Sequence, residues 1–224
     1  MPDAAATGKT CGIVLVTHGG QEKSSAPVSA SQLAVLRMIP VASAIRNAVR
    51  GDAIDVRRPL FKVRGWNGTW ASPVADLTAV LDDIALRSPG VPVVIIGHSM
   101  GARAAFRVAG HRAVAGVAGL APWLPPGEPA GQLAGRRVLL AHGTADRITR
   151  PADTWAYAER ARAVSDPTVI EIRGGDHAMI RRASLWHAIA AEFARASFGL
   201  PAGGGEAAVA VNAAARGAQT VTLW

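Results

Sequence analysis

Short apolar runs alternate with amphipathic stretches along most of this chain. The most apolar run begins at Val91, where five of the first six residues are β-branched, a pattern typical of a strand buried inside a parallel sheet. The run at 53–60 alternates and carries charge, which favours a strand near a sheet edge. The strands predicted in this way cover residues 11–17, 53–60, 91–96, 113–120, 137–141 and 168–172.

The stretches between these runs carry apolar residues at helical spacing. In 76–87, Leu77, Leu81 and Ile84 share one face, and the Ser-Pro-Gly sequence that follows ends the helix. Pro40 interrupts the pattern of 28–50, which predicts either one kinked helix or two short ones. Further helices are expected at 102–109, 152–164 and 181–198.

Strands that alternate with helices through short connections predict an α/β fold with a doubly wound, mostly parallel sheet. All strands then end at one edge of the sheet, where the active sites of such folds lie. A chain of 224 residues is long enough for one domain of this kind, which we expect over residues 1–200. Residues 201–224 carry glycine and alanine runs without a periodic core face, and they predict a flexible tail whose β-forming cluster is 220–224.

Composition narrows the class of protein. Half of the residues are hydrophobic, yet no apolar run reaches the length that a membrane span requires. The first residues contain no apolar segment of the signal-peptide type. The single cysteine, Cys11, cannot form an internal disulfide, which fits a reducing compartment. We therefore expect a cytoplasmic protein without a membrane span.

The formal charge of +8 raises the question of a nucleic-acid partner. Nearly all basic residues are arginines scattered singly, and the few doublets have no interleaved aromatic residues on which bases could stack. A composition rich in alanine, glycine and arginine more often reflects coding bias than a polyanionic partner. No nucleic-acid partner is expected.

The strand at 91–96 runs into G-H-S-M-G, which places Ser99 between Gly97 and Gly101. A serine on a sharp turn between a strand and a helix must adopt a positive φ, and residues two positions away must lack bulk where strand and helix pass close together. The turn exposes the hydroxyl and points the first N–H groups of the helix at whatever Ser99 attacks. The pattern predicts a nucleophile elbow.

A serine hydroxyl needs a base to take its proton, and the base needs a carboxylate to hold its tautomer. His177 follows the last predicted strand in a glycine-rich loop, and Asp146 follows the strand before it. Asp176 is a poorer candidate for the acid because neighbours in one loop rarely orient each other, and we expect it to make a loop hydrogen bond. Glu128, in the preceding loop, lies among prolines and is also disfavoured.

The motifs G-H-S-M-G, H-G-T-A-D-R-I-T and G-D-H-A-M resemble the nucleophile, acid and histidine motifs of the α/β-hydrolase family. The resemblance covers residues 11–198 and is closest to capless serine esterases and dienelactone hydrolases. It implies the family's strand order without its first two strands, which leaves a sheet of about six strands. It also implies an oxyanion hole formed by the N–H groups of Met100 and Gly20, with Gln21 as the alternative to Gly20.

Three further histidines, His18, His98 and His142, lie near predicted strand ends and raise the question of a metal site. No H-x-x-x-H spacing or set of carboxylate partners accompanies them, so we expect them to make structural hydrogen bonds. Neither a metal nor a cofactor is expected.

The predicted activity is hydrolysis of a small-molecule carboxylic ester through an acyl-enzyme on Ser99. Only a short proline-rich loop, 121–129, stands where the family often inserts a helical cap, so we expect an open, shallow cleft and small or single-chain acyl esters. Epoxide hydrolase or dehalogenase chemistry is disfavoured because those relatives carry aspartate at the position of Ser99. A thioesterase, a dienelactone-hydrolase-like enzyme and a non-catalytic binding protein on the same scaffold remain alternatives. The residues expected to line the cleft are Gln21, Trp66, Trp70, Trp123 and Leu124.

Overall fold

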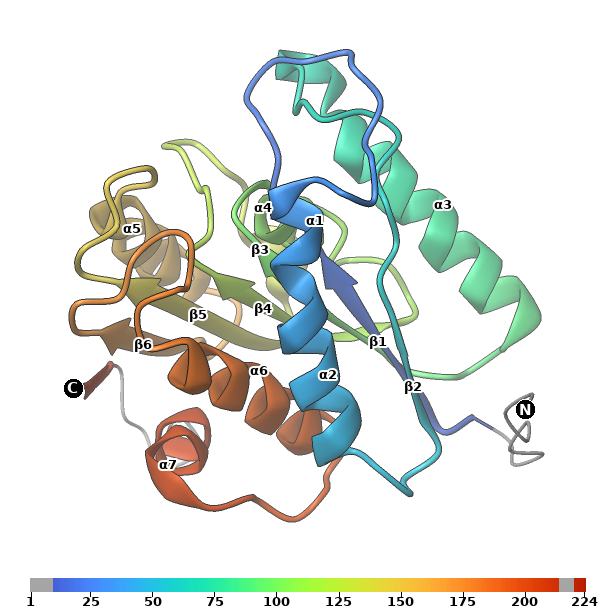
Figure 1. Cartoon of the computed structure of the whole chain (residues 1–224). Helices are drawn as coiled ribbons and strands as arrows, with labels where there is room; N and C mark the ends of the chain where they lie inside the picture. Colours follow the sequence, from blue (N-terminus) through green and yellow to red (C-terminus); the bar gives the residue numbers. More distant parts are fainter. Residues whose placement is uncertain (1–9, 214–219) are drawn as a thin grey trace.

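The computed structural model of the chain describes residues 10–213 and 220–224. Its centre is a sheet of seven parallel strands in the order β2-β1-β3-β4-β5-β6-β7 (Figure 1). Residues 1–9 of the expected domain and residues 214–219 of the expected tail lie outside the described part. The strands are β1 (Gly12–Thr17), β2 (Ile54–Arg57), β3 (Val93–His98), β4 (Val114–Leu120), β5 (Arg137–Gly143), β6 (Thr168–Ile172) and β7 (Val221–Leu223).

Helices cover both faces of the sheet (Figure 1). The core on one face joins the sheet to α2, α6 and α7, and the core on the other joins it to α3, α4 and α5. The chain thus forms a three-layer α/β arrangement, as predicted. The helices are α1 (Leu33–Leu36), α2 (Met38–Ala48), α3 (Ser72–Arg87), α4 (Met100–Arg107), α5 (Pro151–Ala161), α6 (Ala183–Ser197) and α7 (Gly205–Ala213), with short 3₁₀ helices at Gly68–Trp70 and Gly131–Leu133.

The central strands are apolar on both sides because helices pack on both faces of the sheet. In β1, Val14 and Val16 face the core with α2 and α6, whereas Ile13 and Leu15 face the core with α3 and α4. Every residue of β1 and β3 is buried. Their continuous apolar runs, rather than alternating ones, are the sequence signature of this double coverage.

Two finer predictions about the N-terminal half are confirmed. The charged, alternating run gives β2, which lies at an edge of the sheet. The stretch around Pro40 divides into α1 and α2, and the division falls at Arg37. Pro40 then stands in the first turn of α2, where a missing N–H costs no intrahelical hydrogen bond.

The expectation that the segment after residue 200 contributes no core face is wrong for its described part. Helix α7 buries Ala207, Ala210 and Val211 in the core that contains α6. The apolar end of the chain forms β7, which pairs with β6 and makes the sheet seven strands wide rather than about six. Alanine carries too little surface to show an amphipathic period in sequence, although it packs well where two helices approach closely.

None of the helices in the described residues is long and apolar enough to cross a membrane. The carboxyl ends of β1, β3, β5 and β6 lie at the same edge of the sheet because all of these strands are parallel. The loops that follow them begin at His18, Ser99, Thr144 and Arg173. Residues that are far apart in sequence therefore meet above this edge.

Replacing Val211 with aspartate tests the packing of α7. Val211 is 1% exposed and Val209, on the same helix, is 66% exposed. Since a buried carboxylate without a partner is costly, we expect Val211→Asp to lower the free energy of unfolding by about 3 kcal/mol and Val209→Asp to change it by less than about 0.5 kcal/mol. Urea denaturation measures both values, and equal effects would contradict the docking of α7.

Candidate active site

Ser99 stands at the turn between β3 and α4 with φ 53° and ψ −118°. The positive φ is the strained conformation that the sequence predicts for an elbow. A Cβ atom added to Gly97 would lie 2.5 Å from the backbone N of Ala102, and one added to Gly101 would lie 2.4 Å from the carbonyl oxygen of His18. Both glycines are thus required by close backbone packing, which confirms the predicted elbow.

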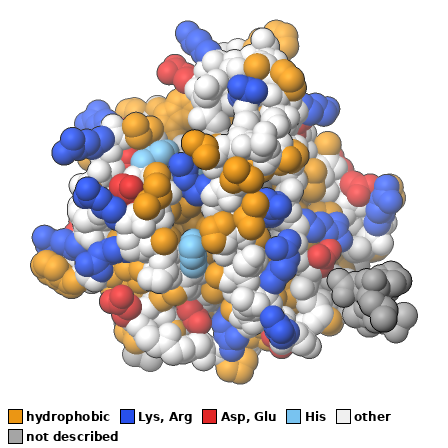
Figure 2. Space-filling view, in the orientation of Figure 1, with side chains coloured by type: hydrophobic (Ala, Val, Ile, Leu, Met, Phe, Trp, Pro, Cys, Tyr) orange, Lys and Arg blue, Asp and Glu red, His pale blue; other side chains and the backbone are white. Residues whose placement is uncertain are grey.

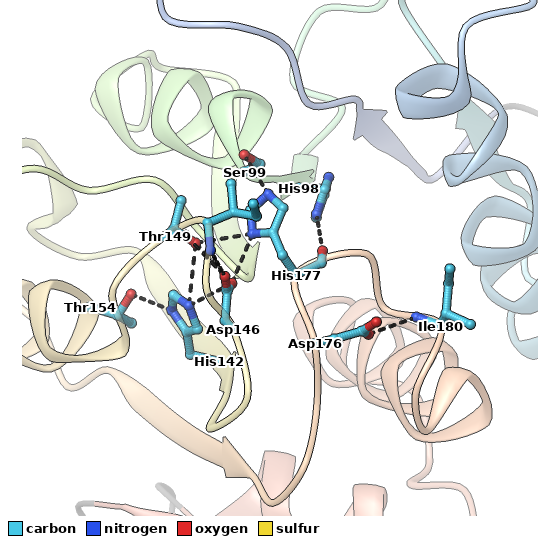
Figure 3. Close-up of polar contacts among 10 residues, drawn as sticks. His98, Ser99, His142, Asp146, Thr149, Thr154, Asp176, His177 and Ile180 are labelled. Atoms are coloured by element: carbon cyan, nitrogen blue, oxygen red, sulfur yellow. Dashed lines mark hydrogen bonds and ion pairs between the residues drawn. The ribbon is translucent and has the colours of Figure 1, made fainter.

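The structure brings Ser99, His177 and Asp146 together (Figure 3). Ser99 Oγ lies 3.1 Å from His177 Nε2, and His177 Nδ1 lies 2.8 Å from Asp146 Oδ2. With Nδ1–H donating to the carboxylate, Nε2 is left to accept the serine proton. The arrangement can remove a proton from the Ser99 hydroxyl as it attacks an electrophile.

The carboxylate of Asp146 is fully buried and accepts five hydrogen bonds. Oδ1 accepts from the backbone N–H groups of Ile148 and Thr149, at 2.8 and 2.9 Å. Oδ2 accepts from His177 Nδ1, from His142 Nε2 at 3.0 Å and from the Thr149 hydroxyl at 2.9 Å. Every position at which this carboxylate can accept a hydrogen bond is therefore occupied.

These hydrogen bonds determine the ionisation of Asp146. Burial by itself would raise the pKa of this carboxyl, but the hydrogen bonds from His142, His177 and the N–H groups of Thr149 and Ile148 outweigh burial and hold the pKa far below its usual range. Asp146 is therefore ionised at neutral pH. It can therefore stabilise a positive charge on His177.

Two members of this network, His142 and Thr149, were not identified as site residues from sequence. His142 is completely buried, and its Nδ1 accepts a hydrogen bond from the Thr154 hydroxyl at 2.7 Å. Thr149 Oγ1 lies 3.1 Å from His177 Nδ1, so its hydroxyl touches both Asp146 and His177. The only available signal was position, because the two residues flank Asp146 four residues before and three residues after it.

His98 fixes the loop that carries His177. Its Nε2–H donates to the carbonyl oxygen of His177 at 2.8 Å, and the two rings lie 4.9 Å apart between centroids. Burial, reinforced by the facing His177, lowers the pKa of His98 to about 3, so the ring is neutral. Its buried Nδ1 has no hydrogen-bond partner among the described residues.

The prediction that His18, His98 and His142 make structural hydrogen bonds is confirmed. His18 donates through Nδ1 to the Gly19 carbonyl and accepts through Nε2 from the N–H of Phe61. The described residues contain no group of three or more His, Cys, Asp or Glu side chains arranged to hold a metal ion.

The two expected oxyanion-hole residues are neighbours in space. A Cβ atom added to Gly20 would meet the Met100 side chain and the carbonyl oxygen of Arg64, and because the latter is a backbone atom, only glycine fits here. The N–H of Gln21 donates to the carbonyl of Arg64 at 2.8 Å and is not available to a ligand. Among the described residues, no acceptor is assigned to the N–H of Gly20 or of Met100. Of the two alternatives for the second donor, this favours Gly20 over Gln21.

The two rival acids have other partners. Asp176 accepts from the N–H groups of Ile180 and Arg181 at 3.0 and 3.1 Å, which is the loop hydrogen bonding predicted for it. Glu128 is buried and forms ion pairs with Arg103 and Arg107 on α4. Among the described residues, neither carboxylate forms a hydrogen bond or ion pair with the His177 ring.

Of the residues expected to line the cleft, some are buried and others are exposed to solvent. Trp66 and Leu124 are buried in the core around α4, so they do not line an open cleft. Trp66 and Trp123 pack on the guanidinium group of Arg103, whose Cζ lies 3.9 and 4.5 Å from the two ring centroids. Gln21 is exposed, and Trp70 is 85% exposed.

The segment between β4 and β5, residues 121–136, contains no helix except the 3₁₀ turn Gly131–Leu133. The predicted absence of a helical cap at this position is confirmed. The Trp123 N–H donates to the Ser99 carbonyl at 3.2 Å, so this segment also supports the elbow.

Comparisons with known proteins show what the sequence of this chain is similar to. A family model described as "Serine aminopeptidase, S33" matches residues 62–136, which include Ser99 but not Asp146 or His177. No protein with a curated description matches the sequence.

Several solved structures are similar in fold. An α/β serine hydrolase without a lid from Xanthomonas campestris is 22% identical, with a TM-score of 0.55 over 90% of this chain and 88% of that chain. A Paleococcus ferrophilus monoacylglycerol lipase is 18% identical, with a TM-score of 0.60 over 83% and 94%. The esterase domain of a Rhodothermus marinus protein is 15% identical, with a TM-score of 0.61 over 86% and 89%. At these identities the likeness is one of fold.

The lowered pKa of Asp146 predicts how stability depends on acid. A carboxyl whose pKa is lower in the folded than in the unfolded chain stabilises the fold above about pH 4, and this contribution is lost as the pH falls further. We expect the difference in free energy of unfolding between the wild type and Asp146→Asn to shrink below pH 4 by up to about 1.4 kcal/mol per pH unit. Urea denaturation at pH 6, 4 and 3 measures it, and a constant difference would contradict the network.

Proposed function

We propose that this chain, which has the α/β-hydrolase fold, is a serine hydrolase that cleaves carboxylic esters through an acyl-enzyme on Ser99. His177 acts as the base, and Asp146 is the carboxylate that orients it. The observation that carries the proposal is the continuous line of hydrogen bonds from Ser99 Oγ through His177 to Asp146 at a strained turn. A serine outside a reactive site has no need of this conformation, which costs on the order of 1–3 kcal/mol.

In the first half of the reaction, Ser99 Oγ attacks the ester carbonyl carbon while His177 Nε2 takes the hydroxyl proton. The carbonyl oxygen becomes an oxyanion, which the N–H groups of Gly20 and Met100 stabilise. The intermediate collapses when the bond to the leaving oxygen breaks, and His177 gives its proton to that oxygen. The alcohol leaves, and the acyl group remains on Ser99.

In the second half, a water molecule attacks the acyl-enzyme and gives a proton to His177 Nε2. The bond to Ser99 Oγ breaks, the proton returns to Oγ and the acid product leaves. Asp146 stays ionised throughout and stabilises the imidazolium that forms in each half. The hydrogen bond from His98 to the His177 carbonyl keeps the ring within reach of Ser99.

Esters are the substrate class best supported for this site. Two of the similar structures are an esterase domain and a monoacylglycerol lipase. The short segment at 121–136 leaves Ser99 without a helical cover, which suits small esters rather than substrates that must be enclosed.

Removal of the Ser99 hydroxyl tests the proposal. We expect a fluorophosphonate probe to label the wild type but not Ser99→Ala, and we expect this change to lower kcat for p-nitrophenyl butyrate by about a thousandfold or more. Ser184→Ala, at the exposed start of α6, is the control and should be labelled like the wild type. A wild type that does not react with the probe would favour a non-catalytic binding protein. Wild-type turnover in Asp146→Asn would show that another residue supplies the carboxylate of the triad.

The hydroxyl of Thr149 gives a finer test, because it touches Asp146 and His177 without reaching Ser99. Thr149→Val keeps the shape of the side chain and removes the hydrogen bond to a charged group, so we expect kcat to fall about tenfold with little change in KM. Thr149→Ser restores the hydroxyl and should restore kcat. A variant pair with equal kcat would show that the hydroxyl does not position His177.

A further inference from the structure

A groove of about 380 Å³ lies beside the His177 loop. One wall comes from α1 and the start of α2, and the other from the turn that follows His177 and from α6. Leu33, Leu36 and Pro40 line the first wall, and Ala178, Met179 and Ile180 line the second. The volume falls within the range of pockets that bind small molecules.

The groove exposes large apolar side chains to water. Leu33 is 77% exposed, Ile180 is 73% exposed and Leu36 is 40% exposed. Figure 2 shows apolar side chains gathered over α1 and α2 on this face, with Lys and Arg side chains around them. Single exposed apolar residues are common, but a concave group of them beside a candidate active site indicates a binding surface.

The turn that carries His177 also builds the second wall of the groove. Asp176 Oδ1 accepts from the N–H of Ile180 (Figure 3) and from that of Arg181. Met179 within the turn has a φ of 57°. The His98 hydrogen bond fixes the other end of the turn at the His177 carbonyl. One rigid segment thus presents an imidazole to Ser99 and, three residues later, an isoleucine to the groove.

We propose that this groove binds the apolar chain of the leaving alcohol of the ester substrate. The inference rests on the proposed function, because the leaving oxygen must approach His177 Nε2 to receive its proton, and residues 178–180, which line the groove, directly follow His177 in the chain. The lining contains no carboxylate, and its charged member is the half-buried Arg37. An uncharged apolar chain suits such walls better than a cationic group.

The groove is less suited to a second copy of the chain. A stable contact between two proteins buries about 800 Å² on each partner, and a groove of this size does not provide such a face. A symmetric contact here would also bring Arg37, Arg181 and Arg182 of one copy towards the same positive residues of the other.

Alkyl acetates of increasing alcohol length test the proposal. We expect kcat/KM of the wild type to rise from ethyl to hexyl acetate, by up to about fourfold for each methylene group that becomes fully buried. In the double variant Leu33→Gln, Ile180→Gln, the hexyl-to-ethyl ratio of kcat/KM should fall by about tenfold or more. Leu86→Gln is the matched control, since Leu86 is 78% exposed but lies on α3, on the opposite face of the sheet.

The outcomes separate this proposal from the proposed function. Hydrolysis of ethyl acetate that depends on Ser99 but is insensitive to alcohol length, in both wild type and double variant, would overturn the groove assignment alone. A length preference that follows the acyl part of p-nitrophenyl esters would overturn the assignment to the alcohol. If no ester is hydrolysed, the proposed function fails, and the groove is then tested by calorimetry with 1-hexanol, whose binding should be lost in the double variant. Equal binding of hexanol by both proteins, or a dimer that the double variant dissociates, would overturn the proposal.

Discussion

A buried carboxylate is the constraint on which the arrangement of the loops depends. Moving an ionised carboxylate out of water costs several kcal/mol, and the cost is recovered only when hydrogen-bond donors surround it. Asp146 obtains its donors from its own turn, from His142 on β5 and from His177 in the loop after β6. The need to satisfy one charge therefore holds two loops together and sets the orientation of the His177 ring.

The candidate nucleophile, Ser99, is held by a second constraint, which is steric rather than electrostatic. Helix α4 passes so close to β3 that Gly97 lies against the backbone of Ala102, and so close to the end of β1 that Gly101 lies against the carbonyl oxygen of His18. Two further hydrogen bonds secure the turn, because the N–H of Ser99 donates to the Leu120 carbonyl and its own carbonyl accepts from Trp123. The backbone conformation of Ser99 is thus held by these contacts, without any contribution from its side chain. The hydrogen bonding of Asp146 positions His177, and the close backbone packing positions Ser99. The two side chains so positioned lie 3.1 Å apart, between Ser99 Oγ and His177 Nε2.

Much of this could be predicted from sequence because the relevant signals are local. Three kinds of signal were used: unbroken β-branched runs, glycines at fixed spacing from a serine, and polar residues just after strands. Each of them reflects a local requirement of the backbone, which neighbouring residues in the sequence must satisfy. The contacts of His142 and Thr149 with Asp146 escaped prediction because they depend on the direction of side chains across β5 and its loop, which no local pattern encodes. The burial of Trp66 was missed for a similar reason, since its partner Arg103 lies on a helix that the sequence does not link to it. Alanine-rich α7 was missed because small side chains leave no amphipathic period.

The absence of a cap and the position of the groove are connected. Where a longer insertion could cover the site, the segment after β4 is instead tied down by Glu128, which holds Arg103 and Arg107, while Trp66 and Trp123 pack on Arg103. These two aromatic rings pack on the guanidinium group of Arg103. Their packed faces are therefore not available to a ligand. Across His177, α1 leaves Leu33 and Leu36 in water beside Ile180. The exposed apolar surface near the His177 loop is therefore on the side of α1 and Ile180.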